Sequence, residues 1–463
     1  MKRCFRVAAA LSALALSFGA FTSCGGKSES ASSAAAPKSE EKSEETTEIK
    51  ADAISTVGPD SGTHLELWTF ADVHCQHYAS MLELWNKEHP DKQIQITFTV
   101  YPFTDMHNKM IMANQTGTGA PDIVDIEVNQ FPNFLKGQVQ FLEMNKYIEE
   151  YKDNVITSRL TIYGDKGKYY GVPFHVGAML MYYDDAELSK YGIDYRTIKT
   201  WDDFEKAGLK LKEATNGEKV FTAVDTGGTD WLWLSMAENG QDWTDANGRA
   251  NVQINGISDM IKMQRRWVEE GIAVPTPGGQ IDAEPGYATV GDEKVLAFPK
   301  ASWYMSRFLN YMPEQKGKWA LAPCPSYKEG QPRCVGVGGT GTVVSLQSKH
   351  QELAAEFIVF AKLSLEGEKR IWEILGFDPV NTAMWSDKAI THNPDNKYVQ
   401  YFRTSPFDVL NEVKDEIGAI KCVQISPTIG ELMNLTVLNN CIEDGADVDE
   451  ELASAQAEID LEQ

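Results

Sequence analysis

The spacing of apolar and polar residues in the first part of the chain predicts strands and helices in alternation. Ile94 to Val100 carries an apolar side chain at every second position, which is typical of a half-buried strand. Leu65 to Phe70 and Asp122 to Ile126 are apolar runs of strand length. Helical spacing predicts a helix around Tyr78 to Trp85, which stops before Pro90, and a second helix that is capped by Thr104 or Asp105 and ends near Gly117.

This order of strand, helix, strand, helix and strand predicts a parallel sheet with right-handed crossovers. Ligands of such sheets lie beyond the carboxyl ends of the strands. The ligand site is therefore expected at Phe70 to His77 and at Glu127 to Phe131.

The middle of the chain is predicted to be mostly helical. Thr200 and Asp203 have the spacing of a capping box at a helix start. Further helices are expected at Trp231 to Asn239, Val252 to Gly271 and Gln351 to Leu365, and strands at Lys294 to Pro299 and Trp319 to Pro323.

Residues 167–183 have the pattern of a segment that passes between two lobes. Lys168 to Val172 is turn and short strand, and Pro173 ends regular pairing because it lacks an N–H donor. Met179 to Tyr183 is a second apolar strand. Phe174 and His175 are therefore expected at a junction, where ligand clefts tend to lie.

The same stretch resembles the crossover of the family-1 extracellular solute-binding proteins of ABC sugar importers, Gly-x-x-Tyr-Gly-Ile-Pro followed by Tyr-Tyr-Asn, with Asp184 in place of the Asn. Lys199 to Phe204 resembles the helix start Pro-x-Thr-Trp-x-Glu-Phe of that family. The resemblance runs in scattered blocks from about residue 62 to 390. It implies an α/β fold with two lobes around a hinged cleft, each lobe a mostly parallel sheet flanked by helices. It also implies a monomeric, non-catalytic receptor that delivers a carbohydrate to an ABC permease.

Combined with the chain pattern, the resemblance divides the sequence into four parts. Lobe 1 is expected at 63–173 and 322–365, and lobe 2 at 174–321 and 366–463, with Trp319 to Pro323 returning to lobe 1. Residues 1–23 have the basic start and small apolar run of a signal peptide, and Cys24 follows in a context that resembles a lipobox. An ordinary secretory signal is the alternative. Residues 24–62 are rich in Ser, Ala, Glu and Lys and are predicted to be a disordered tether. The protein is thus expected in the cell envelope, exported and lipid-anchored in the periplasm or at the outer face of the cell membrane.

The overall charge removes some classes of partner. The 463 residues carry a formal net charge of −24. Nucleic acids and anionic lipids need clustered Lys and Arg, so neither is expected as a partner.

Five cysteines remain after Cys4 and Cys24, an odd number for an exported protein. Cys324 and Cys334 flank a turn-rich insert and are candidates for a disulfide, as are Cys422 and Cys441. Buried free thiols are the alternative for each pair.

Two motifs suggest other chemistry. Gly336 to Gly341 matches Gly-x-Gly-x-x-Gly, but a predicted strand follows it where a dinucleotide site requires a helix, so no such cofactor is expected. By the resemblance, Gly338, Gly339 and Thr340 lie in a loop near the cleft, although the motif is equally consistent with a simple turn. Asp72, His74, Cys75 and His77 allow a metal-binding receptor as an alternative, but no second cluster completes a metal site. We expect them to cap the first helix or to contact a ligand.

Aromatic and polar side chains near the strand ends favour a carbohydrate ligand, because aromatic faces receive the C–H faces of sugars and polar groups receive hydroxyls. A surface glycosidase is the other alternative, although no local motif indicates the two carboxylates that it needs. The segments Trp68 to Asp72, Tyr101 to His107 and Asp122 to Glu127 look similar to arabinose-oligosaccharide binders of the family. The predicted ligand-binding residues are Phe70, Asp72, His74, His77, Glu127, Asn129, Phe174, His175, Trp231, Trp303, Gly338, Gly339, Thr340 and Trp385.

Overall fold

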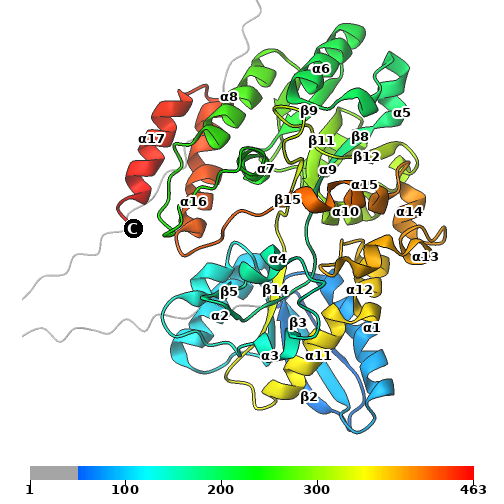
Figure 1. Cartoon of the computed structure of the whole chain (residues 1–463), viewed down its shortest axis with the longest axis vertical. Coiled ribbons are helices and arrows are strands. Elements are labelled where there is room, and N and C mark those ends of the chain that lie inside the picture. The colour runs from blue at the N-terminus through cyan, green and yellow to red at the C-terminus, as the bar shows by residue number, and fades with distance from the viewer. Residues whose placement is uncertain (1–50) are drawn as a thin grey trace, which may run out of the picture. The chain divides into compact units, whose positions relative to one another are not determined.

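Two β-sheets organise the chain (Figure 1). The structure is a computed structural model, and it describes residues 51–463. The predicted signal peptide, Cys24 and most of the predicted tether lie outside the described residues. Within the described part of the chain, no helix is long and apolar enough to cross a membrane.

The first sheet has the strand order β1-β3-β2-β4-β14-β7. Its central strands β2, β3 and β4 are parallel, as predicted, whereas β1, β14 and β7 pair antiparallel to their neighbours. The bounds are β1 (Ala53–Val57), β2 (Thr63–Thr69), β3 (Ile94–Val100), β4 (Ile123–Glu127), β7 (Val172–Pro173) and β14 (Thr340–Val344).

Alternating side chains of these strands enter two different cores. Leu67 and Ile123 join the core that contains the buried faces of α1 (Asp72–Glu88) and α11 (Gln351–Leu363). Trp68 and Val124 join the core that contains α2 (Phe103–Thr116). α2 begins directly after Pro102, which fixes φ at the helix start, so the predicted cap at Thr104 or Asp105 is wrong. The carboxyl ends of β2 and β4 lead to the two segments where a ligand was expected.

The second sheet has the strand order β10-β9-β11-β8-β12. It is also mixed, with β10, β9 and β11 parallel and β8 antiparallel to both of its neighbours. The predicted capping box is confirmed: the Thr200 side chain accepts from Asp203 N–H and the Asp203 side chain accepts from Thr200 N–H. The elements are β8 (Met179–Asp184), β9 (Val220–Val224), β10 (Ala273–Pro275), β11 (Val295–Ala301) and β12 (Trp319–Ala322), with α5 (Asp185–Leu188), α6 (Trp201–Thr215), α7 (Asp230–Glu238), α8 (Asn255–Glu269), α9 (Glu284–Gly291) and α10 (Met305–Tyr311).

The predicted passage between sheets is confirmed, because β7 belongs to the first sheet and β8 to the second. Gly177 lies in this passage with φ of +71°, and a Cβ there would approach the carbonyl oxygen of Val337 to 2.3 Å. Only glycine fits at that position. The segments 174–178 and 336–339 thus pass each other closely where the chain crosses between the sheets.

Three parts of the structure differ from the expected division of the chain. β12 pairs with β8 in the second sheet, and the chain rejoins the first sheet only at β14. α12 (Leu365–Arg370) stays beside α1, where Arg370 donates to the Ser80 carbonyl oxygen at 2.7 Å. Residues 53–57, expected in the tether, pair with Thr97 and its neighbours in β3 as strand β1. All five of its residues are exposed, so the backbone ladder to β3 and the hydrogen bond between the Thr56 and Thr97 hydroxyls hold it in register.

The remaining elements lie mainly in the last third of the chain. Short elements of the first part are α3 (Asn145–Ile148), α4 (Thr157–Thr161), β5 (Gly164–Asp165) and β6 (Lys168–Tyr169), and those near the C-terminus are β13 (Cys334–Val335), α13 (Lys388–Thr391), α14 (Lys397–Tyr401), α15 (Pro406–Val413), β15 (Ile417–Gly418), α16 (Ser426–Leu432) and α17 (Val448–Ile459).

A chain that starts at residue 62 is expected to be less stable than one that starts at residue 51, by about 2 kcal/mol, because the ladder between β1 and β3 is lost. It should still fold, since β3 keeps its pairing with β2. Urea unfolding of the two purified chains measures the difference. Equal midpoints and slopes would show that β1 adds nothing to the fold.

Candidate functional site: a polar cleft between the two sheets

A cleft of about 150 Å³ lies where the two sheets face each other. The first sheet contributes the end of β4 and the turn after it, and the second contributes the start of α7, the turn before α9, the end of β11 and Trp303 in the helical turn that follows β11. The segment 336–339 forms part of the wall. The lining residues are Glu127, Asn129, Thr229, Asp230, Trp233, Gln280, Asp282, Lys300, Trp303, Val337 and Gly338.

Lys300 is the cation at the centre of this cleft. Its Nζ lies 2.5 Å from Asp230 Oδ2 and 3.4 Å from Asp225 Oδ2, and its side chain is only 4% exposed. Burial alone would lower the pKa of Lys300, but the carboxylates of Asp230 and Asp225 outweigh burial and raise it. Lys300 therefore stays protonated and holds the Asp230 carboxylate in one orientation at the cleft.

A second ion pair lies beside the first. Arg307 Nε and Nη2 donate to Asp282 Oδ1 and Oδ2 at 2.8 and 3.2 Å, and the Tyr287 hydroxyl donates to Asp282 Oδ1 at 2.6 Å. Burial opposes ionisation of Asp282, yet the Arg307 guanidinium lowers the pKa of this carboxyl. Asp282 is thus a fixed, ionised acceptor on the wall that the second sheet supplies.

Glu127 approaches from the first sheet, as predicted. Its carboxylate accepts from Asn129 N–H at 2.8 Å and from Asn129 Nδ2 at 3.1 Å. Burial raises the pKa of Glu127 to about 7, because these hydrogen bonds and the nearby Arg159 only partly offset the loss of water. Its partners belong to its own turn, so the carboxylate is held close to the end of β4.

Trp303 is half-buried, and its indole N–H donates to the Val337 carbonyl oxygen at 3.1 Å. This bond ties the aromatic side chain of the second sheet to segment 336–339. Gly338 has φ of +65°, and its carbonyl oxygen accepts from Arg159 Nη2 at 2.5 Å. The cleft therefore combines a partly exposed aromatic side chain with backbone and carboxylate acceptors.

The structure brings four of the predicted site residues together at this cleft: Glu127, Asn129, Trp303 and Gly338. Their role in binding stays a prediction. Sequence reasoning missed Asp230, Lys300 and Asp282. The only sequence signal for Asp230 and Lys300 was that the predicted site residues Trp231 and Trp303 lie close to them in the chain. No signal in the sequence indicated Asp282.

The histidines after β2 are core residues, which corrects their predicted role at the ligand. His74 Nδ1 lies 2.9 Å from Asp125 Oδ2, and its ring lies 4.4 Å from that of Phe174. His77 is fully buried against the Ala361 carbonyl oxygen, and burial lowers the pKa of His77 to about 3. Asp125 also accepts from Tyr78, so His74, Asp125 and Tyr78 form a buried polar network.

Several predicted contact residues are likewise packed against other parts of the protein and do not line the cleft. Phe174 is fully buried, and His175 packs on Phe377 with a ring distance of 4.6 Å. Trp231 packs among Trp201 and Trp267. The others are Trp385, Thr340 and Gly339. The Trp385 indole N–H donates to the Pro379 carbonyl oxygen, and Thr340 is paired with β4 as part of β14. The Gly339 carbonyl oxygen accepts from Val128 N–H.

Phe70 and Asp72 are accessible but lie outside the cleft lining. Phe70 packs edge-on against Phe103, and Asp72 is exposed in the first turn of α1. Within residues 51–463, no group of three or more His, Cys, Asp or Glu side chains is placed to hold a metal ion.

The candidate disulfide between Cys324 and Cys334 is not formed in the structure, and Cys422 and Cys441 are also free thiols. Cys334 Sγ instead lies 3.3 Å from the Met179 carbonyl oxygen of β8 and hydrogen-bonds to it. Burial raises the pKa of the Cys422 thiol to about 12, so it stays protonated. The alternative of buried free thiols is therefore the one that the structure shows.

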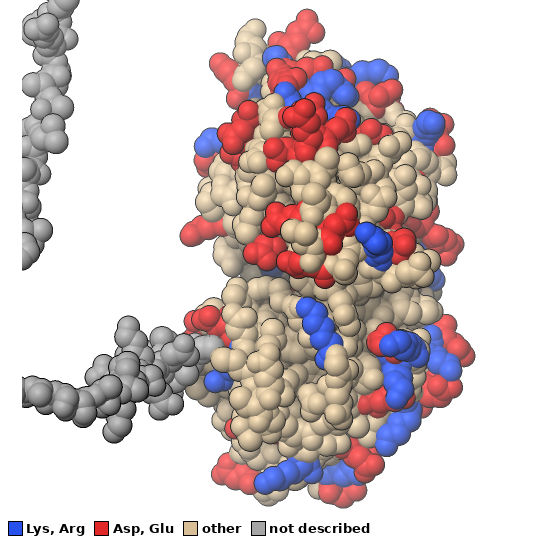
Figure 2. Space-filling view, turned by 90° about the vertical axis from the view of Figure 1, so that its left-hand side faces the viewer, with Lys and Arg blue, Asp and Glu red and all other residues tan. Residues whose placement is uncertain are grey.

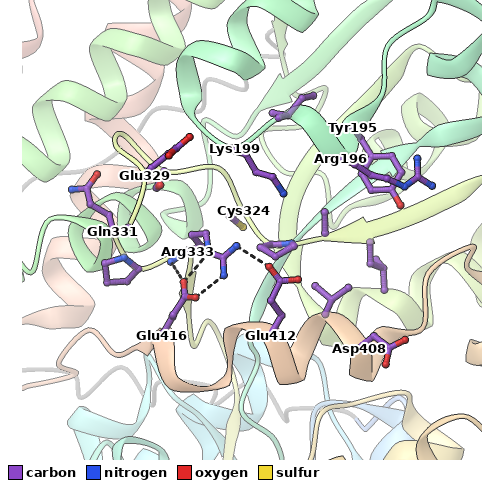
Figure 3. Close-up of a pocket in the computed structure, with 18 of the residues that line it drawn as sticks. Tyr195, Arg196, Lys199, Cys324, Glu329, Gln331, Arg333, Asp408, Glu412 and Glu416 are labelled. Carbon is purple, nitrogen blue, oxygen red and sulfur yellow. Dashed lines mark hydrogen bonds and ion pairs between the residues drawn. The ribbon is translucent and has the colours of Figure 1, made fainter.

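A larger groove of about 800 Å³ opens elsewhere on the side of the second sheet (Figure 3). Arg333 crosses it and pairs with Glu412 and Glu416 at 2.9 and 2.6 Å. Its other lining residues come from β12, the loop after it, the segment before α6, and α15. The first sheet supplies none of its lining residues, so the groove lacks the two-sided geometry of the cleft.

Comparison with known proteins identifies the class. Residues 77–363 match the family described as bacterial extracellular solute-binding protein. The chain belongs to this family, which confirms the resemblance of the crossover and of the capping-box helix.

Two relatives and two solved structures show how far the similarity extends. The chain is 38% identical over 415 residues to the arabinooligosaccharide-binding protein of Halalkalibacterium halodurans, covering 89% of this chain and 92% of the relative. It is 37% identical over 389 residues to the protein of the same name from Bacillus subtilis, covering 83% and 89%. The fold is similar to that of the sugar-binding protein MalE from Xanthomonas citri, with a TM-score of 0.71 and 17% identity over 86% of this chain and 97% of that chain. It is also similar to a Bifidobacterium animalis ABC transporter associated binding protein in complex with β-1,6-galactobiose, with a TM-score of 0.69, 20% identity and the same coverage.

Proposed function

We propose that the protein binds oligosaccharides in the cleft between its two sheets and delivers them to an ABC import permease. The observation that carries this proposal is the two-sided lining of the cleft, with Glu127 from the first sheet facing Trp303 and Asp230 from the second. A ligand that contacts both sides stabilises the closed arrangement by its differential affinity for it. The passage through Gly177 is the natural hinge for that motion.

Arabino-oligosaccharides are the proposed ligands. The support is the similarity over most of the chain to two arabinooligosaccharide-binding proteins, together with the cleft chemistry. Pentose oligosaccharides present hydroxyl donors to carboxylates and flat C–H faces to an indole ring. The small cleft of about 150 Å³ requires further opening to admit a chain of several sugars.

Titration calorimetry against arabinose and its α-1,5-linked oligomers, with xylo-, gluco- and galacto-oligosaccharides of equal length, tests the proposal. We expect arabino-oligomers to bind with micromolar or tighter Kd and the others at least tenfold more weakly. Binding of another series alone would correct the ligand. No binding to any series would overturn the carbohydrate proposal.

We further propose that the protein performs no bond chemistry. The named relatives are binding proteins, and the Asp230 and Asp282 carboxylates are each held by a cation. Glu127, with a pKa of about 7, is the one cleft group suited to act as a general acid, which is the feature that favours a glycosidase. Chromatography of each oligosaccharide after long incubation decides between the two, because new products would establish hydrolysis.

We also propose that the protein is exported, that a lipid on Cys24 anchors it to the membrane, and that it is a monomer. The family description supports an extracytoplasmic location, and the motif around Cys24 supports lipidation. Replacing Cys24 with Ser is expected to release the protein from the membrane fraction, because the attached lipid chains are its proposed anchor. Sedimentation of the variant with membranes after cell fractionation would contradict this.

A further inference from the structure

The cleft offers many hydrogen-bond acceptors but few free donors. The Lys300 ammonium donates to Asp230 and Asp225, and the Trp303 indole donates to Val337. The Asn129 amide donates to Glu127, and the Gln280 amide donates to the Gly227 carbonyl oxygen. Each of these four side chains therefore has at least one donor engaged within the protein.

One buried donor of the lining has no partner among the described residues, and the Thr229 hydroxyl is a further donor in the lining. The Trp233 indole N–H is buried, and its side chain lines the cleft two residues after Trp231, which points into the core. A buried N–H without a partner destabilises the protein, so a ligand oxygen that accepts a hydrogen bond from it removes this cost and makes the free energy of binding more favourable. The indole N–H and the Thr229 hydroxyl are both uncharged donors.

The ionised side chains of the lining are also mostly negative, and carboxylates only accept hydrogen bonds. Glu127, Asp230 and Asp282 bring three carboxylates, whereas Lys300 is the one lining cation. Lys300 is shared with Asp225, and the nearby Arg307 is paired with Asp282. Asp and Glu also form patches on the surface around the second sheet on the face seen in Figure 2.

From this arrangement we infer that the cleft selects neutral oligosaccharides and rejects those that carry a carboxylate or phosphate group. The inference rests on the proposed carbohydrate function and specifies its ligand class. Neutral sugars bring hydroxyl donors that match the carboxylate acceptors. An acidic sugar brings additional acceptors and a negative charge, whereas Lys300, the cation of the lining, is already paired with Asp230 and Asp225. At about 4 Å and an effective dielectric constant near 20, one such like-charge contact lowers affinity by about a hundredfold or more.

The test uses matched ligands made from one neutral oligosaccharide that binds. Oxidation of the reducing end gives an aldonate, and borohydride reduction of the same end gives a neutral alditol of equal length. Oxidation of the free primary hydroxyl places a carboxylate at the other end, with the untreated sugar as its neutral reference. Titrations are done at pH 8, above the pKa of Glu127, so that the lining is fully ionised.

We expect at least one acidic form to bind about a hundredfold more weakly than its neutral match. Glu127→Gln and Asp230→Asn each remove a negative charge from the lining, so each should lower the ratio of the acidic to the neutral Kd by about tenfold. Asp230→Asn also frees Lys300 to pair with the ligand. Glu329→Gln, which removes a carboxylate from the distant groove of Figure 3, is the matched control and should leave the ratio unchanged.

Binding of both acidic forms within threefold of their neutral matches would overturn the inference while leaving the carbohydrate function standing. An unchanged ratio in both cleft variants, with their thermal melts intact, would show that the selectivity has another source. Failure of every neutral oligosaccharide to bind would overturn the proposed function and the inference together.

Discussion

Replacing Trp303 with alanine is expected to weaken oligosaccharide binding about thirtyfold or more. The side chain is half-buried at the cleft, with its indole N–H held by the Val337 carbonyl oxygen. Stacking on a sugar contributes about 0.5–1.5 kcal/mol, and burial of the ring face adds about 1–2 kcal/mol at 25 cal/mol per Å². Together these amount to about 1.5–3.5 kcal/mol, and the middle of that range corresponds to somewhat more than thirtyfold in Kd.

Two further variants separate stacking from other effects. Trp303→Phe keeps an aromatic face but loses the bond to Val337, so it should retain most of the affinity. Trp231→Ala removes a core side chain that packs on Trp267, so it should lower the melting temperature rather than the affinity of the folded fraction. The measurements are calorimetric titration and thermal melting of the apo protein. If Trp303→Ala binds normally but melts early, Trp303 is a structural residue.

The fold was predictable because its central strands have clear periodic patterns. Ile94 to Val100 alternates along the chain, and the structure has β3 at those residues. The edges were less predictable. β1 is fully exposed and has no apolar face, so no pattern distinguished it from a tether. β12 pairs antiparallel with β8 and so stays in the second sheet, and the chain returns to the first sheet only at β14. The composition of β12 does not indicate which strand it pairs with.

The candidate site was predictable only where the topology places it. Glu127 was found because it ends a parallel strand, and ligands lie at such ends. His74 and His77 follow the neighbouring strand but turn inward, since the first turns of α1 bury that face. In α7, Trp231 faces the core and Trp233 lines the cleft. Two positions along a helix differ by about 200°, and sequence alone does not say which one faces the ligand.

Replacing Asp378 with alanine is expected to lower the free energy of unfolding by about 3–6 kcal/mol. The Asp378 carboxylate is fully buried and accepts from Gly177 N–H at 3.1 Å, Ala178 N–H at 2.8 Å and the Ser302 hydroxyl at 2.5 Å. It thereby fixes the passage between the sheets. Alanine leaves three buried donors without a partner, and each costs about 1–2 kcal/mol. Asp387→Ala is the matched control, because Asp387 accepts from Ala389 N–H at an exposed helix start, where the loss is about 1 kcal/mol.

Asp378→Asn is expected to be milder, and its effect should depend on pH. Burial raises the pKa of Asp378 from 3.8 to about 6, because loss of water outweighs the three donors. The folded state therefore binds the proton more tightly than the unfolded state. This contribution to stability is fully present below about pH 4 and is lost as the pH rises to about 6, amounting to about 3 kcal/mol.

Asparagine does not ionise, so the Asp378→Asn variant does not lose this stability as the pH rises. At pH 4 the variant should be less stable than the parent protein by about 1–3 kcal/mol, since its amide leaves one backbone N–H without an acceptor. By pH 7 the gap should close or reverse. Urea unfolding of both proteins at pH 4, 5.5 and 7 measures the change, and a gap that stays constant across this range would show that Asp378 is ionised throughout and that the donors outweigh burial.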